Sequence, residues 1–174
     1  MESLIAHIRK QVADPLRAVD SATWVEPMPT IAPPATPAEV DAAEEVLGFP
    51  IPLLLRRLYV EVGNGGFGPS YGLEGVPRIP PVPGTADLVA LYEMYNSGPP
   101  EDDPRHMWPH GWVPLISGGC LYMECADFLA TPHRVRRYDG NAGKWGRPID
   151  EWFEPVAASL EAWLEAWLAG SGCG

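Results

Sequence analysis

The chain has 174 residues, of which 46% are hydrophobic and seven are tryptophan, a composition that predicts one folded domain and argues against global disorder. Its 21 prolines and 18 glycines indicate many loops and short elements, which favours an irregular α+β domain over a helix bundle. Twelve basic side chains against 23 acidic ones give a net charge of −11, which disfavours nucleic acid as a partner and favours a basic protein, unless the charge serves solubility alone.

A short amphipathic helix is predicted at the N-terminus, ending near residues 14–15. Its apolar positions are Leu4, Ile5, Ile8 and Val12. Basic side chains and a histidine interrupt this apolar run, so it does not resemble a signal peptide. No apolar stretch approaches the roughly 20 residues that span a bilayer. The odd number of cysteines, three, argues against a disulfide framework, and we therefore expect a cytoplasmic protein.

Two helices joined by a proline-marked connector are predicted within residues 36–68. Thr36 and Glu39 can form a capping box at the start of the first helix, with Pro37 in its first turn. Gly48 stands where a residue in the left-handed conformation commonly ends a helix. This pattern predicts a first helix of about three turns between the two caps.

The second helix of the pair begins at Pro52 and ends at the glycine-rich run 63–68. Its apolar face consists of Leu54, Leu55, Leu58, Tyr59 and Val62. A run of this kind can bind phosphate where it follows a strand and opens a helix. Here it follows a helix and enters a loop, so we interpret it as a helix stop. The binding surface is therefore expected elsewhere, among the acidic loops.

Residues 67–84 are predicted to be irregular, with a short edge strand around 76–79. Thr85 is placed to cap another helix. The apolar side of that helix consists of Leu88, Leu91, Tyr92 and Tyr95. The acidic segment 97–104 follows as an exposed loop.

Three consecutive segments then predict an antiparallel sheet. They are residues 112–116, residues 120–125, which alternate like a half-buried strand, and residues 133–138. Turn signals at 117–119 and 139–141 lie at the ends of these segments. Pairing of consecutive strands is the simplest topology.

Three arginines, Arg134, Arg136 and Arg137, lie on the third segment, and the first two share one face. In so acidic a chain we expect them to pair with its own carboxylates rather than to bind phosphate.

The last predicted element is an amphipathic helix that ends at Gly170. Its apolar stripe, at i, i+4, i+7, i+8, i+11 and i+12, consists of Val156, Leu160, Trp163, Leu164, Trp167 and Leu168. Core packing explains a single stripe, and dimerisation through the same helix stays open.

The order and spacing of these elements resemble the SUKH superfamily (the Smi/Knr-type domain) over residues 36–169. In the first half the matching positions are Thr36, Pro37, Glu39, Glu44, Leu47, Gly48, Pro52, Leu58, Tyr59, Asn64, Gly65 and Gly66. In the second half they are residues 113–116, 118–119, 135–139 and 159–164. The chain departs from the pattern at 117–120, where the family turn often carries an acidic residue.

The resemblance implies an α+β domain over residues 36–170, with a small, mainly antiparallel sheet packed with several helices and a C-terminal amphipathic helix. Residues 1–35, which hold the N-terminal helix and a proline-rich link, and a flexible tail at 171–174 lie outside it.

The resemblance also implies a function. Bacterial members are typically immunity proteins that neutralise polymorphic or contact-dependent toxins, often nucleases. The implied protein is a non-catalytic inhibitor without a cofactor, which binds a basic cognate toxin and occludes its active or substrate-binding surface. It would act as a monomer or homodimer. The alternative is a general interaction or regulatory scaffold, as eukaryotic members suggest.

No catalytic, cofactor-binding or metal-binding residues are predicted. Cys120 and Cys125 are five positions apart on a predicted strand, so they point to opposite faces of the sheet, which disfavours a shared metal ion. Nothing in the sequence around His106, His110 and His133 resembles a zinc site or a Cys–His nucleophile pair. An enzyme that uses these residues is left as an open alternative.

A partner-binding surface is predicted at acidic and aromatic side chains. Glu101, Asp102 and Asp103 form the densest run of like charge and could steer a cationic partner, with a merely solvated loop as the alternative. Glu74 and Trp108 are assigned to the same surface, the tryptophan because aromatic side chains commonly supply binding hot spots.

Overall fold

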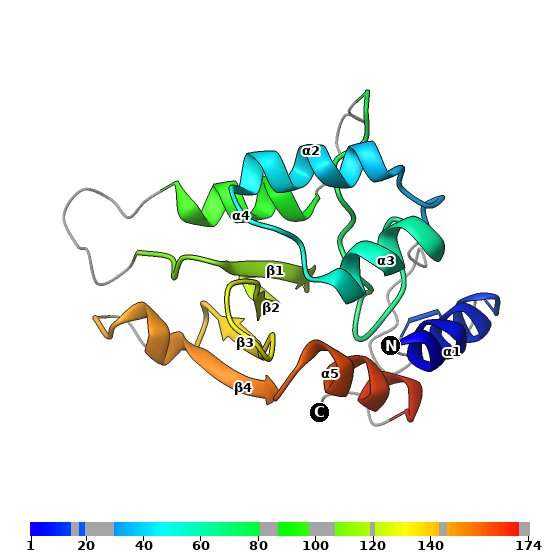
Figure 1. Ribbon diagram of the computed structural model, residues 1–174. Coiled ribbons are helices and arrows are strands. Elements are labelled where there is room, and N and C mark those ends of the chain that lie inside the picture. Colours follow the sequence, from blue (N-terminus) through cyan, green and yellow to red (C-terminus); the bar gives the residue numbers. More distant parts are fainter. Residues whose placement is uncertain are drawn as a thin grey trace.

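The computed structural model describes residues 1–14, 18–19, 30–80, 87–97, 107–118, 121–142 and 146–170. In these ranges the chain is an α+β domain with five α-helices and one four-stranded antiparallel sheet (Figure 1). The helices are α1 (Glu2–Val12), α2 (Pro37–Leu47), α3 (Leu53–Glu61), α4 (Leu88–Asn96) and α5 (Leu160–Leu168). The strands are β1 (Trp112–Ser117), β2 (Tyr122–Asp127), β3 (Val135–Asp139) and β4 (Phe153–Ala157), the last preceded by a 3₁₀-helix (Ile149–Trp152).

The sheet has the order β1-β2-β3-β4, so each strand pairs antiparallel with the next in the chain, as the sequence predicts. Helices α2 and α4 lie together over one side of the sheet, while α5 follows β4 and lies beside α1 (Figure 1). Register shifts occur between Pro114 and Ile116 in β1 and between Val135 and Arg136 in β3. Such irregularities bend a strand and increase its twist.

The predicted alternation of burial in the second strand is wrong. In β2, every residue from Met123 to Asp127 is buried. Both faces of this strand are covered, because α4 packs along the neighbouring β1 while Trp163 of α5 reaches Glu124 from the other side. A strand covered on both faces loses the period-two pattern on which the prediction rested.

The fourth strand was not predicted, and Val156 belongs to it rather than to the last helix. Pro155 lies inside β4, which is an edge strand, and an edge strand tolerates proline because its missing N–H group need not join a ladder. The helix itself starts only at Leu160, where the Ser159 hydroxyl accepts a hydrogen bond from the N–H of Ala162 at 3.1 Å.

The predicted capping box at α2 is confirmed. The N–H of Glu39 donates to the Thr36 hydroxyl at 3.2 Å, and the N–H of Thr36 donates to the Glu39 carboxylate at 2.7 Å. Gly48 ends the helix at φ +80°, in the left-handed region. At α4, however, Asp87 is the cap, with its carboxylate accepting two backbone N–H groups, whereas Thr85 lies outside the described residues.

One hydrophobic core joins all the helices to the sheet. It includes Leu4, Ile5 and Ile8 of α1, which are at most 6% exposed, so this N-terminal helix packs with the segment that follows the proline-rich link. Within the described ranges, none of the helices is both long and apolar enough to cross a membrane.

Candidate functional site

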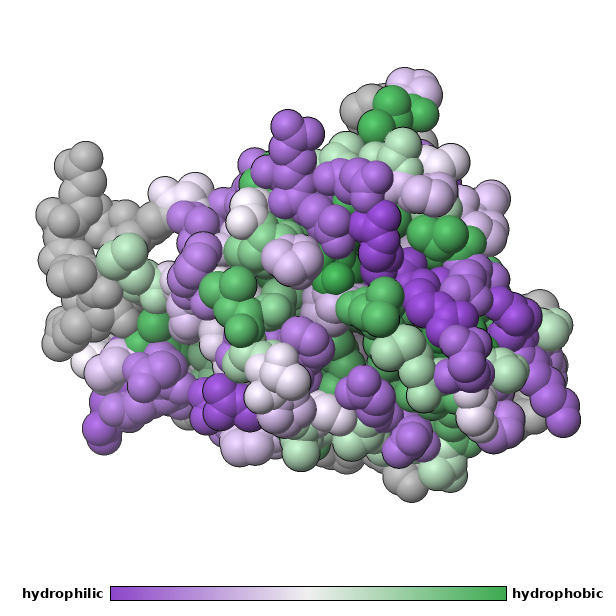
Figure 2. Space-filling model, in the orientation of Figure 1, coloured by the Kyte–Doolittle hydropathy of each residue, from purple (hydrophilic) through white to green (hydrophobic). Residues whose placement is uncertain are grey.

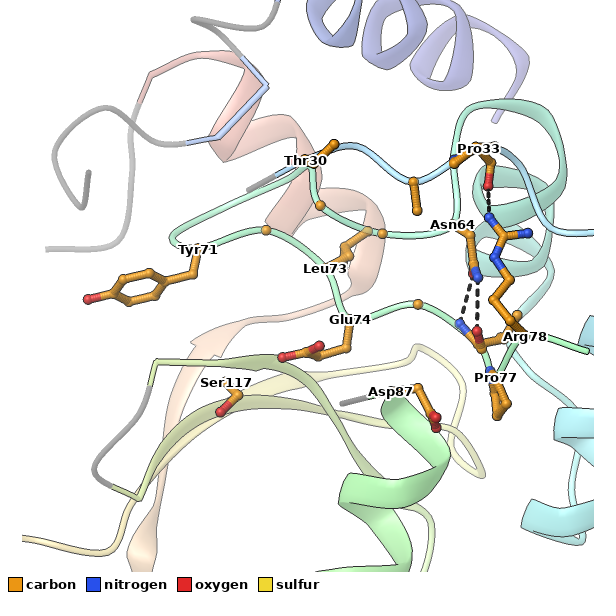
Figure 3. A pocket seen from close by; sticks show the side chains of 16 residues that line it. Thr30, Pro33, Asn64, Tyr71, Leu73, Glu74, Pro77, Arg78, Asp87 and Ser117 are labelled. Atoms are coloured by element: carbon orange, nitrogen blue, oxygen red, sulfur yellow. Dashed lines mark hydrogen bonds between the residues drawn. The ribbon is translucent and has the colours of Figure 1, made fainter. Parts of the chain in front are cut away.

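A cavity of about 540 Å³ opens between the end of α3, the segment 71–78, the start of α4 and the end of β1 (Figure 3). Its walls include the glycine-rich stop, with Asn64, Gly65 and Gly66. The predicted helix stop is therefore present, because α3 ends at Glu61, and it also forms part of a concave surface. Pockets of about 300–1,000 Å³ are typical of ligand sites.

The side chain of Asn64 fixes the shape of this cavity. Its amide group donates to the carbonyl of Val76 and accepts from the N–H of Val76, both at 2.8 Å (Figure 3). These two bonds use the backbone N–H and carbonyl of Val76, which are then not available for pairing with another strand. The edge strand predicted at 76–79 is absent, and that prediction is wrong. Asn64 is only 6% exposed, so loss of these bonds would leave buried polar groups without partners.

The glycines of the stop are required by close approach of the backbone. Gly65 has φ +89° and Gly66 has φ +79°, a region that residues with a side chain rarely adopt. A Cβ atom on Gly65 would lie 2.6 Å from the carbonyl oxygen of Leu73, and one on Gly66 would collide with the carbonyl of Thr30. The run thus packs against other parts of the chain.

Glu74 is the half-buried carboxylate of the cavity. Its N–H donates to Leu115 of β1 at 2.8 Å, and its carbonyl accepts from the Tyr59 hydroxyl at 2.9 Å, so the backbone here is held on two sides. Burial raises the pKa of the Glu74 carboxyl to about 7. A hydrogen bond from the backbone of Ser117 lowers this pKa, and the negative charge of Asp87 raises it further.

Arg78 also lines the cavity but does not neutralise Glu74. Its guanidinium donates to the carbonyls of Pro33 and Pro34 and contacts the Glu39 carboxylate at 3.5 Å. Glu39 keeps a lowered pKa, chiefly through the hydrogen bond from the backbone of Thr36. In the described part of the chain, no cationic side chain forms an ion pair with Glu74.

The other arginines are largely committed to internal pairs. Besides Arg78, ion pairs with the chain's own carboxylates are made by Arg9, Arg56, Arg57, Arg134, Arg137 and Arg147. Figure 2 shows hydrophilic side chains gathered over α2 and over the region of α3 and α1, where several of these pairs lie. The internal pairing predicted for the third strand is confirmed for Arg134 and Arg137, while Arg136 lies over the Trp112 ring at 5.7 Å.

Of the five predicted partner-binding residues the structure describes two, Glu74 and Trp108, and they do not share the cavity. Glu74 lines the cavity, whereas Trp108 is absent from its walls and is 6% exposed. The Trp108 ring packs against Tyr95, Tyr138 and Phe153, and its indole N–H donates to the carbonyl of Trp112 at 2.6 Å.

Glu101, Asp102 and Asp103 lie outside the described residues. Sequence reasoning missed Asn64, Arg78, Asp87 and Ser117 as parts of the cavity. The one signal for this cavity in the sequence was the number of glycines on both sides of residue 70, because glycines often mark places where two backbone segments approach closely.

Three cysteine and histidine side chains in the described ranges, Cys125, His110 and His133, are buried or bonded to other parts of the chain. Cys125 is fully buried, and this burial raises the pKa of its thiol well above the usual value, which disfavours the reactive thiolate. His110 Nδ1 lies 3.3 Å from the Tyr92 hydroxyl, and His133 Nδ1 lies 3.0 Å from the carbonyl of Asp127. No group of three or more potential metal ligands gathers among the described side chains.

A second cavity, of about 640 Å³, lies between α1 and α5, with His7, Lys10 and Glu165 among its walls. Its carboxylate, Glu165, is exposed, so no half-buried carboxylate lines this second cavity. The cavity at Glu74 is therefore the better candidate for binding a cationic group.

The fold is an α+β domain in which helices and a four-stranded antiparallel meander enclose one core. Its cavity lies at the glycine-rich turn that follows α3. The sequence profile of the SMI1 / KNR4 family (SUKH-1) matches residues 34–166, more than half of the chain, and the protein belongs to this family. The match begins just before the capping box and excludes α1. None of the curated proteins matches the chain.

Proposed function

We propose that this protein is an immunity protein that binds and neutralises a cognate toxin of a polymorphic or contact-dependent system, with nucleases a prominent toxin class. Membership of the SUKH-1 family carries this proposal, because it is consistent with an immunity role in general. The net charge of −11 supports the further choice of a basic toxin as partner.

The proposed mechanism is stoichiometric occlusion. An acidic surface would attract the basic substrate groove of the toxin over long range and then cover it, so no catalytic step is needed. Internal pairing of most described arginines supports this, since it leaves the surplus of carboxylates to set the field around the protein. The residues 101–103 would contribute to the steering, and the protein would act in the cytoplasm, where a nuclease toxin finds its substrate.

The proposal is tested by co-expression with the product of the adjacent gene. We expect that product to stop growth when expressed alone, the present chain to restore growth, and the two to elute together at low salt. The association rate should fall steeply as the ionic strength rises, because exposed charges are screened over about 10 Å at 0.1 M salt. An adjacent product that is harmless, or that forms no complex at low salt, would contradict the proposal.

A variant with Glu101, Asp102 and Asp103 changed to their amides tests the steering role. We expect a lower association rate with a similar dissociation rate, which is the usual consequence of removing charges at the rim of an interface. A matched variant with Glu45, Glu93 and Glu165, which are exposed in α2, α4 and α5, changed to glutamine removes the same three charges and controls for net charge alone. Capture of cellular regulators in place of a toxin would instead support the scaffold alternative.

A further inference from the structure

We propose that the cavity around Glu74 receives a cationic side chain, arginine or lysine, of the partner, with the Glu74 carboxylate as its counter-ion. This inference rests on the proposed function in that it assumes a basic protein partner. It goes further by naming the anchor point on this chain and the chemistry that fits it.

The first argument is that Glu74 has no cationic partner among the residues that the structure describes. The cationic side chain on the cavity wall, Arg78, is engaged by two backbone carbonyls and by Glu39 of the α2 capping box. The other carboxylate of the wall, Asp87, accepts the N–H groups of Val89 and Ala90 and so serves the start of α4. Glu74 is thus left as the acidic group free to pair with an incoming cation.

The second argument concerns position and size. Figure 3 shows the Glu74 side chain between the segment that carries Leu73 and the strand that carries Ser117, with Asp87 to one side at the start of α4. A volume of about 540 Å³ accommodates a long side chain together with part of the backbone that carries it. The rim is held by the Asn64–Val76 bonds, so the opening is preformed.

The third argument is electrostatic. A carboxylate desolvated without a cation is held in an unfavourable state, which an entering guanidinium or ammonium group relieves. The charged and titratable groups that face Glu74 are Asp87 from α4, Arg78 from its own segment and Tyr71 at the rim. Because the pKa of Glu74 is about 7 in the free protein, a bound cation should lower it, and binding should strengthen as the pH rises.

Nα-acetyl-arginine amide is a suitable probe, with the citrulline analogue as its uncharged isostere. In an NMR titration of the full chain, we expect the arginine probe to shift the amide signals of Gly65, Gly66 and Gly75, with a millimolar dissociation constant for so small a ligand. The citrulline probe should leave them unchanged. Between about pH 6 and pH 8 the affinity should rise about tenfold, as the ionised fraction of a carboxyl with pKa near 7 rises.

The variant Glu74→Gln keeps the shape of the side chain and should abolish both the shifts and their pH dependence. Glu93→Gln, which removes the same charge from an exposed position of α4, should behave as the wild type. Equal shifts with arginine and citrulline, no shifts at all, or unchanged binding by Glu74→Gln would each overturn the proposal.

The complex with the toxin separates this inference from the proposed function. We expect Glu74→Gln to weaken the complex at least tenfold through faster dissociation, and Glu93→Gln to leave the dissociation rate unchanged. If Glu74→Gln binds the toxin as tightly as the wild type, the immunity function stands and the cavity is not its anchor. If the wild type binds the arginine probe but no toxin, the cavity stands and the proposed function fails.

Discussion

Replacement of Glu124 by glutamine tests the polar group at the centre of the sheet. Glu124 lies in the middle of β2 and is 0% exposed. Its Oε2 accepts the indole N–H of Trp163 from α5 at 2.9 Å, and its Oε1 lies 3.4 Å from Nη2 of Arg137, its direct partner across β3. One carboxylate therefore joins two strands and the last helix.

The expected loss follows from the full burial of Glu124 and the partial burial of Arg137. Removing one charge of a buried ion pair costs about 3–5 kcal/mol when the other charge is left desolvated. The Arg137 side chain is 22% exposed and can recover part of its hydration, so we expect about 2–4 kcal/mol for Glu124→Gln. The glutamine carbonyl can still accept from Trp163, so this change isolates the ionic part of the interaction.

Urea denaturation followed by far-ultraviolet circular dichroism measures the effect, with linear extrapolation of the free energy of unfolding. A double-mutant cycle with Arg137→Gln should give a coupling free energy of about 1–3 kcal/mol. The change Trp163→Phe is a separate control that removes the N–H donor while keeping an aromatic ring. An unchanged urea midpoint for Glu124→Gln, or a coupling below about 0.5 kcal/mol, would refute this account of the sheet centre.

Three further predictions concern stability. Gly65→Ala should lower the free energy of unfolding by more than about 3 kcal/mol, because φ is +89° and the new Cβ would lie 2.6 Å from a backbone oxygen. Gly48→Ala, at φ +80° with open space around the new Cβ, should lower it by only about 1 kcal/mol. Equal thermal midpoints for the two variants would contradict this expectation. The folded-state pKa of Glu74, about 7, lies above its ordinary value of 4.5, so the wild type loses stability as the pH rises between these values. Glu74→Gln should therefore be more stable than the wild type by about 1–3 kcal/mol near pH 8 and equal near pH 4 in urea titrations, and a difference at acid pH would count against the assignment. Thr36→Ala should cost about 1 kcal/mol through loss of the cap of α2, and a midpoint equal to that of the wild type would show that the Glu39 carboxylate alone holds the helix start.

The parts of the fold that could be predicted are those with local causes. The capping box at Thr36, the left-handed Gly48 and the helix stop at residues 63–66 depend on bonds and dihedral angles within a few positions, so their residue types indicate them directly. The antiparallel order of the first three strands follows from short connections, which allow pairing of consecutive segments.

The wrong predictions concern elements whose structure depends on contacts with segments far away in the sequence. Val156 fits the helical spacing of the last stripe, yet it lies in β4, because this segment pairs along the edge of the sheet beside β3. Burial on both faces removed the alternation of β2, since α5 supplies a partner even for a carboxylate there. Likewise the 76–79 segment forms no strand, because the Asn64 side chain bonds both backbone groups of Val76 and the Glu39 carboxylate accepts the N–H of Ile79.

The sequence by itself determined the family, the acidic character and the local caps of the helices, because each of these depends on residue types at fixed spacings. Only the tertiary structure decided that the glycine-rich stop lines a cavity. It also decided that no cation in the described part of the chain pairs with Glu74, because Arg78 is engaged elsewhere. The physical reason is that desolvation and charge pairing depend on which segments meet in space, and spacing along the chain does not fix this.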